Sequence, residues 1–570
     1  MGFEPARATP RQVHLSTDVP PPARAEPSAA SPSAQSLSAV FDALPTQGGG
    51  PAGARLLSDN LDAWNARWDM VSQATTSIDA VYFSLEKDVF GHAFLGTLLE
   101  KQLSGVQVRV MTDAMADTFG QRGFKMPLRG KDYLQELVHH GAKAYVFHPL
   151  WQRPAKVFRG DYSLLASNHD KLLVVDGQRS LTGGRNIGID YFADPHDRPH
   201  AWRDMDVALE GAGPAKGLTA ALNDELKQGN VARPVHEDRL GNWAKRDLEL
   251  LATAKMMDVW LKAPAFSEAQ KAQLRADPAA RAKLAAELVD EGLALVPPSR
   301  RRAPNAREQQ KLTELAAQLV EQLEARGSHA RYQASRLPER ATEAKILDQT
   351  SAAGTRVNGI APALAALTDA ASKRIIIQNP YVVLTESMLA SLEKASQRGV
   401  EITILTNSPL STDSAVTQAF FLEDWQTILA RCPTARIFVA TGERKLHGKS
   451  AVIDDDQALV TTYNLDLLSG YVNSEVGAVV KSRELAEDLL GELEKDRAAV
   501  SNGFLEYRIE KDANGEAVLK DGKPIPVFGP ENHLPPELIE EYSKKRKLWG
   551  QTLRENLGYF EPLRHPKPTE

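Results

Sequence analysis

The chain has 570 residues, among them 68 Lys or Arg and 74 Asp or Glu, and a formal net charge of −6. A chain of this length is expected to divide into roughly two to four domains, and its nearly balanced charge disfavours proteins that bind nucleic acid through an overall positive field. The single cysteine, Cys432, excludes a fold that depends on intramolecular disulfides and is consistent with a reducing compartment.

The N-terminal segment is rich in Pro, Ala, Ser and Gly and has neither a helical nor a strand period, so we predict a disordered arm over residues 1–53. It has no apolar run of the signal-peptide kind, and no later stretch reaches the roughly 18 apolar residues of a membrane-spanning helix. We therefore expect a protein that stays in the cytoplasm or lies at the membrane periphery. Export by a system that needs no signal peptide is the alternative.

Helical and strand patterns alternate after this arm. Residues 61–74 and 91–103 have the spacing of helices, and residues 78–83 and 106–112 alternate as strands, followed by a short strand over 143–147. Alternation of this kind is typical of an α/β sheet. We assign residues 54–211 to a first lobe.

A long charged segment, residues 212–349, follows the first lobe and is predicted to be helical. Its clearest signal is an apolar stripe at helical spacing, consistent with an insertion that packs on the lobes as a cover. A role in shaping a substrate site or binding a partner is the alternative. The stripe consists of Leu312, Leu315, Leu319, Val320 and Leu323.

The order of elements then repeats. Residues 374–383 correspond to the strand 78–83, residues 389–397 to the helix after it, and residues 400–406 to the strand 106–112. Residues 435–439 match the short strand of the first lobe. We therefore predict a second, similar lobe over residues 350–500, related to the first by a pseudo-twofold axis.

The last segment, residues 501–570, is predicted to form a hairpin and a helix. The run Asp512-Ala513-Asn514-Gly515 is a turn signal. The basic cluster Lys544-Lys545-Arg546-Lys547 is interpreted as a solvated helix face, with contact to anionic headgroups as the alternative.

Each lobe contains one copy of a motif in which His and Lys stand two residues apart at the start of an apolar, strand-like run. On a strand, residues two apart point to the same face, so His and Lys project together. Two copies in register with a whole-lobe repeat are difficult to attribute to chance. The spacing is the same in both copies: His169, Lys171, Asp176, Gly183, Gly184 and Asn186 in the first lobe, and His447, Lys449, Asp454, Thr461, Thr462 and Asn464 in the second.

These residue types suit the chemistry of a phosphodiester. Lysine and asparagine side chains can balance the charge of the phosphoryl oxygens, one imidazole can attack phosphorus, and a second imidazole can act as general acid and base. Each lobe supplies one histidine, so the lobes must meet at one composite site. The two imidazoles need different protonation states, which their environments must create.

Carboxylates near the imidazoles could orient them. The internal alignment makes Asp204 equivalent to Glu475, because each heads a strand that follows the motif of its lobe. The alternative for both is an ordinary acid at a strand end. Asp176 and Asp454 are interpreted as residues that fix the turn after each motif strand.

The motifs resemble those of the phospholipase D superfamily, and the segments around Gly183-Gly184-Arg185-Asn186 and Trp202-Arg203-Asp204 are similar to its bacterial cardiolipin synthase-like branch. The resemblance covers nearly everything from residue 56 to residue 496 apart from the insertion. It implies a ping-pong reaction without metal or cofactor. In it, His169 attacks and His447 is the general acid/base, although the sequence alone does not decide which histidine attacks. The phosphate would be held by Lys171, Asn186, Lys449 and Asn464, beside the substrate-facing pairs Gly183-Gly184 and Thr461-Thr462.

Two departures from the family pattern bear on the substrate. Thr461-Thr462 replace the small pair usual in the second motif, and the membrane-spanning N-terminal helices of some cardiolipin synthases are missing. We expect a phospholipase D-type enzyme that acts, as a monomer, on phospholipids at a membrane surface, with water or an alcohol as acceptor. A metal-independent nuclease and an inactive lipid-binding module are the alternatives.

Overall fold

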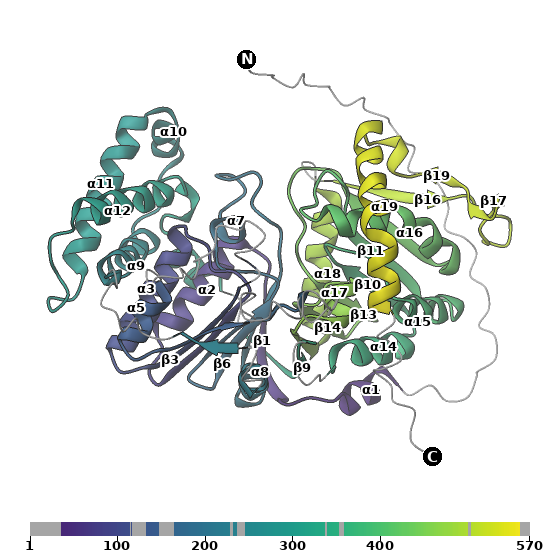
Figure 1. Cartoon of the computed structure of the whole chain (residues 1–570), viewed down its shortest axis with the longest axis horizontal. Helices are drawn as coiled ribbons and strands as arrows, with labels where there is room; N and C mark the ends of the chain where they lie inside the picture. Colours follow the sequence, from purple (N-terminus) through teal and green to yellow (C-terminus); the bar gives the residue numbers. More distant parts are fainter. Residues whose placement is uncertain are drawn as a thin grey trace.

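The computed structural model describes residues 36–114, 116, 133–147, 165–227, 232–235, 245–336, 339–352, 358–499 and 503–558. Two α/β lobes lie side by side, the first coloured purple to teal and the second green in Figure 1. The two-lobed α/β fold predicted from the sequence is thereby confirmed.

The predicted elements at the start of the first lobe are confirmed, with ends that agree to within two residues. The lobe consists of β1 (Gly49–Leu57), α2 (Asn60–Ser72), β2 (Ser77–Tyr82), α3 (Val89–Leu103), β3 (Gln107–Asp113), α5 (Tyr133–His139), β4 (Lys143–Phe147), β5 (Lys171–Val175), β6 (Arg179–Gly183), α7 (Ile189–Phe192), β7 (Asp206–Glu210), α8 (Ala212–Lys227) and β8 (Ala232–Pro234).

The second lobe repeats this series. It consists of β9 (Arg340–Gln349), α14 (Ile360–Ala370), β10 (Arg374–Gln378), α15 (Glu386–Gln397), β11 (Glu401–Asn407), α16 (Ala415–Arg431), β12 (Ala435–Ala440), β13 (Ser450–Ile453), β14 (Gln457–Thr461), α17 (Leu467–Tyr471), β15 (Glu475–Lys481), α18 (Arg483–Ala498) and β16 (Phe504–Ile509).

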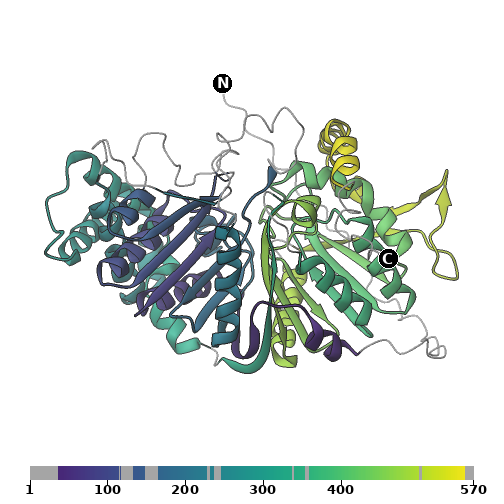
Figure 2. The same ribbon diagram turned by 60° about the horizontal axis from the view of Figure 1, so that its bottom comes forward.

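Strand pairing shows that the two lobes are copies. In the first, the pairing order is β4–β3–β2–β5–β6–β7–β1, and in the second it is β12–β11–β10–β13–β14–β15–β9. In each lobe the first three strands run parallel and the others pair antiparallel, which makes a mixed sheet. The junction is the antiparallel pair of β1 and β9, from Gly49↔Lys345 to Ala54↔Arg340. Strand pairing therefore continues from one lobe into the other (Figure 2).

An apolar core also crosses the junction. The helices α8 and α18 are equivalent, because they follow the equivalent strands β7 and β15. Their buried residues Leu222 and Leu489 belong to one hydrophobic cluster with Ile346 of β9. Burial of this shared apolar surface stabilises the contact between the two lobes.

Part of the segment predicted to be a disordered arm is ordered, which corrects the prediction for residues 36–53. Residues 1–35 lie outside the described residues, but α1 (Leu37–Ala43) and β1 form within the segment expected to be disordered. Ser36 caps α1 by accepting a hydrogen bond from the Ala39 amide, and Phe41 is fully buried against the second lobe. A composition rich in Pro, Ala and Gly hid this helix, because its stabilising contacts come from residues far along the chain.

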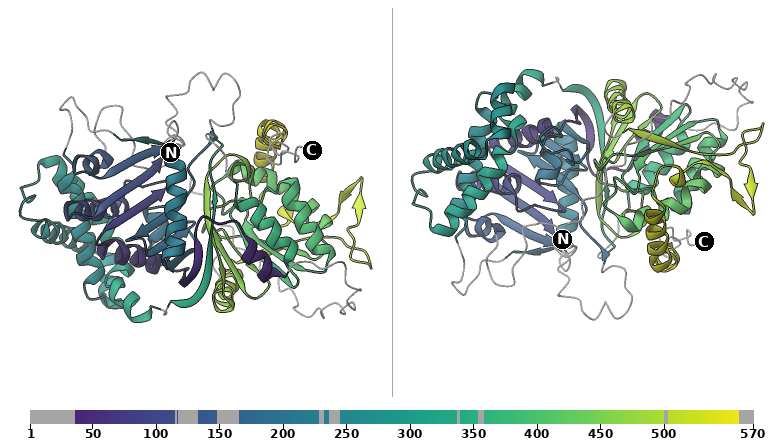
Figure 3. Two further views of the ribbon diagram at one scale, coloured as in Figure 1. Left: turned by 90° about the horizontal axis from the view of Figure 1, so that it is seen from below. Right: turned by 90° about the horizontal axis from the view of Figure 1, so that it is seen from above.

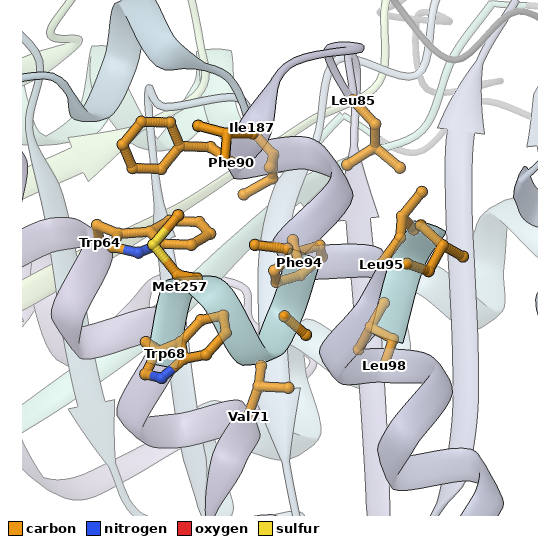
Figure 4. Close-up of a cluster of buried hydrophobic side chains, with 14 of the residues drawn as sticks. Trp64, Trp68, Val71, Leu85, Phe90, Phe94, Leu95, Leu98, Ile187 and Met257 are labelled. Carbon is orange, nitrogen blue, oxygen red and sulfur yellow. The ribbon is translucent and has the colours of Figure 1, made fainter. Parts of the chain in front are cut away.

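The helical insertion belongs to the first lobe. Its elements are α9 (Asp247–Lys262), α10 (Glu268–Ala276), α11 (Pro278–Leu295), α12 (Ala306–Val320), η3 (Leu323–Ala325) and α13 (Ser328–Ser335). Both views in Figure 3 show them on the outer side of that lobe. Figure 4 shows Met257 of α9 among Trp64 and Trp68 of α2 and Phe94 of α3, so the insertion completes a hydrophobic core. The predicted stripe is buried, whereas β9, at the end of the predicted insertion, is a strand of the second lobe.

The C-terminal segment contains the predicted turn, closed by a hydrogen bond of 3.0 Å from the Gly515 amide to the Asp512 carbonyl. The basic cluster lies on α19, where Lys544 pairs with Glu540 at 2.7 Å and Arg546 pairs with Glu423. The remaining elements are β17 (Leu519–Lys520), β18 (Lys523–Pro524), β19 (Pro526–Phe528), η4 (Pro530–Asn532) and α19 (Pro536–Gly558).

Candidate active site

The two His-x-Lys motifs meet at the junction of the lobes. The amide of His169 donates to the carbonyl of Ser474 at 3.2 Å, and the amide of His447 donates to the carbonyl of Arg203 at 2.7 Å. Each histidine therefore lies against the backbone of the opposite lobe, just before the strand, β5 or β13, that carries its lysine. The composite site that the sequence predicted is present as an arrangement of residues.

The carboxylates equivalent by sequence are exchanged between the lobes. Glu475 of the second lobe contacts Nδ1 of His169 at 2.9 Å, and Asp204 of the first lobe contacts Nδ1 of His447 at 2.7 Å. Both carboxylates are fully buried. A carboxylate on Nδ1 fixes the tautomer and orientation of an imidazole and leaves Nε2 as the atom available for chemistry.

The two lysines are buried beside the histidines. Lys171 donates to the carbonyl of His169 at 2.8 Å, and Lys449 donates to the carbonyl of His447 at 2.6 Å and lies 3.0 Å from both of its ring nitrogens. Burial and the neighbouring charge of Lys449 lower the pKa of Lys171 to about 7, and burial lowers the pKa of Lys449 to about 8. The ammonium groups of Lys171 and Lys449 repel each other, and this arrangement favours binding of an anion beside them.

The imidazoles and the acid beside them are shifted towards their neutral forms. Burial and then the lysines lower the pKa of both His169 and His447 well below the ordinary value, and burial raises the pKa of Glu475 to about 8. The unlike protonation states expected for the two histidines therefore require a further charge. A bound phosphate supplies a negative charge of the right sign to favour a protonated imidazole.

The motif asparagines are held differently in the two lobes. Asn186 accepts from the Ser84 amide at 3.1 Å and donates to the Tyr191 hydroxyl at 2.9 Å. The backbone amide of Asn464 donates to Ser469 Oγ at 3.2 Å, and its buried side-chain Oδ1 has no hydrogen-bond partner among the described residues. Among the described residues, the side-chain oxygen of Asn464 can therefore still accept a hydrogen bond, whereas that of Asn186 already accepts one.

Gly183-Gly184 and Thr461-Thr462 differ in size, and the residues packed against each pair differ in size to match. A Cβ on Gly184 would lie 2.0 Å from Oδ1 of Asp204, so the glycine is required by the close approach of that carboxylate. In the second lobe the longer Glu475 stands back, and the hydroxyl of Thr462 donates to it. Gly183 pairs with Asp206, whereas Thr461 pairs with Gly477, which gives it room.

Both threonine hydroxyls make hydrogen bonds within the protein. The Thr462 hydroxyl is used by Glu475, and the Thr461 hydroxyl accepts from the Tyr463 amide at 3.2 Å. If the threonine hydroxyls of this substrate-facing pair bind substrate, these internal hydrogen bonds must be exchanged for bonds to substrate.

Asp176 and Asp454 lie at the other ends of the motif strands. Both adopt a left-handed backbone, with φ of 54° and 52°, and accept hydrogen bonds from backbone amides of the strand-entry segment beside them. Asp176 accepts from Thr76 at 2.8 Å, and Asp454 accepts from Lys373 at 2.8 Å. These bonds fix the turns, away from the histidines.

Sequence reasoning missed several residues that contact the histidines. The Trp202 ring lies 4.9 Å from His447 and the Phe83 ring 5.5 Å from His169, centre to centre. Lys445 and Asp413 form an ion pair of 3.1 Å next to Trp202. Trp202 was visible in the family-like segment Trp202-Arg203-Asp204, but the loop residues Lys445 and Asp413 carry no periodic signal that would have identified them.

Arg203 joins the lobes beside His447. Its guanidinium pairs with Asp496 at 2.7 Å and Glu492 at 2.8 Å, both on α18. Because the carbonyl of Arg203 accepts from the His447 amide and the next residue is Asp204, this clamp fixes the segment that orients His447.

Within the described ranges, no group of three or more His, Cys, Asp or Glu side chains is arranged to hold a metal ion. None of the helices described combines the length and apolar character needed to cross a bilayer.

Comparison with known proteins gives one consistent answer. Residues 68–207 and 364–497 match the family described as cardiolipin synthase, PLD-like domain, with one match in each lobe. The chain is 25% identical to cardiolipin synthase C of Escherichia coli (strain K12) over 477 residues, which cover 78% of this chain and 84% of the relative. It is 30% identical to the major cardiolipin synthase of Bacillus subtilis (strain 168) over 156 residues, which cover 27% of this chain and 29% of the relative.

Among solved structures, the phosphatidylserine synthase of Haemophilus influenzae Rd KW20 is similar to this chain. The TM-score is 0.52 and the identity 14%, over 93% of this chain and 98% of that one. At this identity the likeness concerns the fold, and it agrees with the two-lobed arrangement derived from the strand pairing.

Proposed function

Because the chain belongs to the phospholipase D superfamily, we propose that it is a phosphatidyltransferase that cleaves a phospholipid through a phosphohistidine and passes the phosphatidyl group to water or to an alcohol. The observation that carries the proposal is the pair of imidazoles, each held at Nδ1 by a buried carboxylate of the other lobe. The buried lysines beside them supply the positive charge that a phosphodiester requires.

In the first step, the lone pair on Nε2 of His169 forms a bond to phosphorus while the bond from phosphorus to the headgroup oxygen breaks. Nε2 of His447 gives its proton to that oxygen, so the headgroup leaves as a neutral alcohol. Lys171 and Lys449 balance the charge on the phosphoryl oxygens. Asn186 and Asn464 complete the set of donors.

In the second step, Nε2 of His447 takes a proton from water or from an alcohol. The freed oxygen lone pair forms a bond to phosphorus, and the bond to Nε2 of His169 breaks. Water gives phosphatidate, whereas an alcohol such as the glycerol of a second lipid headgroup gives a new phosphodiester. The outcome depends on which acceptor reaches His447 first.

Phospholipid is favoured as the substrate for two reasons. The relatives that match over most or part of the chain carry the name cardiolipin synthase. The formal net charge of −6 also lacks the positive excess that a nuclease uses to attract its polyanionic substrate.

The test is mass spectrometry of phosphatidylglycerol vesicles incubated with the purified full chain, with and without added glycerol. We expect phosphatidate, cardiolipin or both, together with a trapped phosphohistidine, and no product from His169→Asn. If lipid is untouched while single-stranded DNA is cut in the presence of a chelator, the chain is a nuclease. If no phosphodiester yields a phosphohistidine, the chain is a binding module and the proposal is wrong.

A further inference from the structure

An ammonium group already occupies a cation site beside His447. The Nζ atom of Lys445 lies 3.5 Å from the centre of the Trp202 ring and 3.1 Å from Oδ2 of Asp413. The Tyr381 hydroxyl donates to the other oxygen of Asp413 at 2.6 Å. An aromatic face combined with a carboxylate is the arrangement that proteins use to bind ammonium groups, including those of small ligands.

This cation site is next to the reacting groups and open on one side. The Trp202 ring lies 4.9 Å from the ring of His447, and the Tyr191 ring lies 4.4 Å from Trp202. The Lys445 side chain is 13% exposed, whereas that of Asp413 is 35% exposed, so the site meets solvent on the Asp413 side. A headgroup whose oxygen reaches His447 would bring its far end into this region.

The equivalent position in the other half of the active site is different. Two residues before His169 stands Ser167, in the place of Lys445, and two residues before Glu475 stands Asn473, in the place of Trp202. This pair also meets across the lobes, because the Ser167 amide donates to Asn473 Oδ1 at 3.2 Å. The two equivalent positions therefore contact each other in both halves of the site. Beside His447 the contact joins a cation and an aromatic ring, Lys445 and Trp202, whereas beside His169 it is a hydrogen bond between Ser167 and Asn473.

We propose that Trp202 and Asp413 form an ammonium-binding position for lipid headgroups beside His447, and that Lys445 occupies it and so selects against ethanolamine and choline headgroups. The inference rests on the proposed cleavage of phospholipids and specifies which headgroups are used. Glycerol-type headgroups carry no cation and do not compete for the position.

Two physical effects make a tethered lysine an effective selector. Its ammonium is held in the chain at a high effective concentration, so an incoming ammonium must displace it rather than fill an empty site. Until it is displaced, its charge also repels the incoming cation. Removing the charge of Lys445 would leave Trp202 and Asp413 in place with their preference for a cation unsatisfied.

The test compares headgroup release from phosphatidylglycerol and phosphatidylethanolamine in mixed vesicles by the full chain and by Lys445→Met. We expect the ratio of ethanolamine to glycerol release to rise by about tenfold in the variant. Asp413→Asn added to Lys445→Met removes the carboxylate and should return the ratio towards that of the unchanged chain. Lys262→Met removes an exposed lysine of the insertion and should leave the ratio unchanged.

An unchanged ratio in Lys445→Met would overturn the inference, and an equal loss of cleavage of both lipids would mean that Lys445 acts on the phosphate that they share. Lys445→Gln removes the same charge and replaces the methionine variant if circular dichroism shows that the latter is unfolded. A chain that releases no headgroup from either lipid contradicts the proposed function instead, so the two failures are distinct.

Discussion

The two lobes share a backbone but not the side chains around their histidines. In the first lobe a glycine lies under the short carboxylate of Asp204, whereas in the second Thr462 donates to the longer Glu475. Beside His447 the junction contains Trp202 with Lys445, where the His169 side has Asn473 with Ser167. A duplicated frame can therefore place two histidines symmetrically while their surroundings prepare them for different steps.

The largest effect is expected from the histidines. His169→Asn and His447→Asn should each reduce release of a natural headgroup by at least about 10⁴-fold, because a nucleophile and a general acid are lost. Nitrophenolate leaves a phosphatidyl ester without being protonated, so in the first turnover His447→Asn should release far more nitrophenol than His169→Asn, although the second step still needs His447. Equal loss, or the reverse preference, measured as nitrophenol release, would exchange the roles of the two lobes.

The exchanged carboxylates come next. Asp204→Asn and Glu475→Gln should each lower kcat by about 10²- to 10⁴-fold, since the amide no longer fixes the Nδ1–H tautomer of its histidine. Asp204→Asn should spare the nitrophenyl ester in the same way as His447→Asn. Asp454→Asn is the matched control, because it alters a turn away from the histidines. It should lower Tm and leave kcat nearly unchanged. If Asp204→Asn lost as much activity on the nitrophenyl ester as on a natural lipid, Asp204 would not act through His447 as the acid of the first step.

The difference in volume between the lobes can be tested directly. In Gly184→Ala the new Cβ would lie 2.0 Å from Asp204 Oδ1, and we expect about a 100-fold fall in kcat as that carboxylate moves away from His447. Thr462→Ser keeps the hydroxyl that Glu475 accepts and should cost less than about threefold. Steady-state kinetics on phosphatidylglycerol vesicles measures both. An active Gly184→Ala enzyme would mean that Asp204 can shift without cost.

The ion pairs of Arg203 beside His447 should have a smaller effect. Arg203→Met breaks the ion pairs with Asp496 and Glu492, and we expect kcat to fall by about tenfold while KM changes little, because the clamp positions Asp204 rather than binding substrate. Arg203→Lys should recover part of the loss. A rise in KM alone, or a rise in KM as large as the fall in kcat, would indicate that Arg203 contacts the lipid instead.

The smallest effect concerns pH. The ammonium forms of the two lysines bind the phosphate anion, and with the pKa of Lys171 near 7 and that of Lys449 near 8 they are lost as the pH rises through this range. Inhibition by a dialkyl phosphate, which keeps one negative charge throughout, should weaken by up to about tenfold for each unit above pH 8. Binding that strengthens or stays constant between pH 7 and 9 would contradict the lowered values.

Local patterns predicted the elements well where periodicity was strong. The strand–helix–strand series after residue 60, its repeat after residue 373 and the buried stripe of α12 all follow from apolar spacing. The helix α1 and the strand β1 were missed, because a Pro- and Gly-rich composition conceals segments whose burial is supplied by distant parts of the chain.

The sequence by itself determined that two His-x-Lys motifs lie at equivalent points of two repeated lobes, because strand period and motif spacing are local properties of the chain. Only the tertiary structure decided that each histidine takes its carboxylate from the other lobe, across 306 residues for His169 and 243 for His447. It also decided that Lys445 meets Trp202. Such contacts depend on how strands β1 and β9 join the lobes, and no local pattern encodes that pairing.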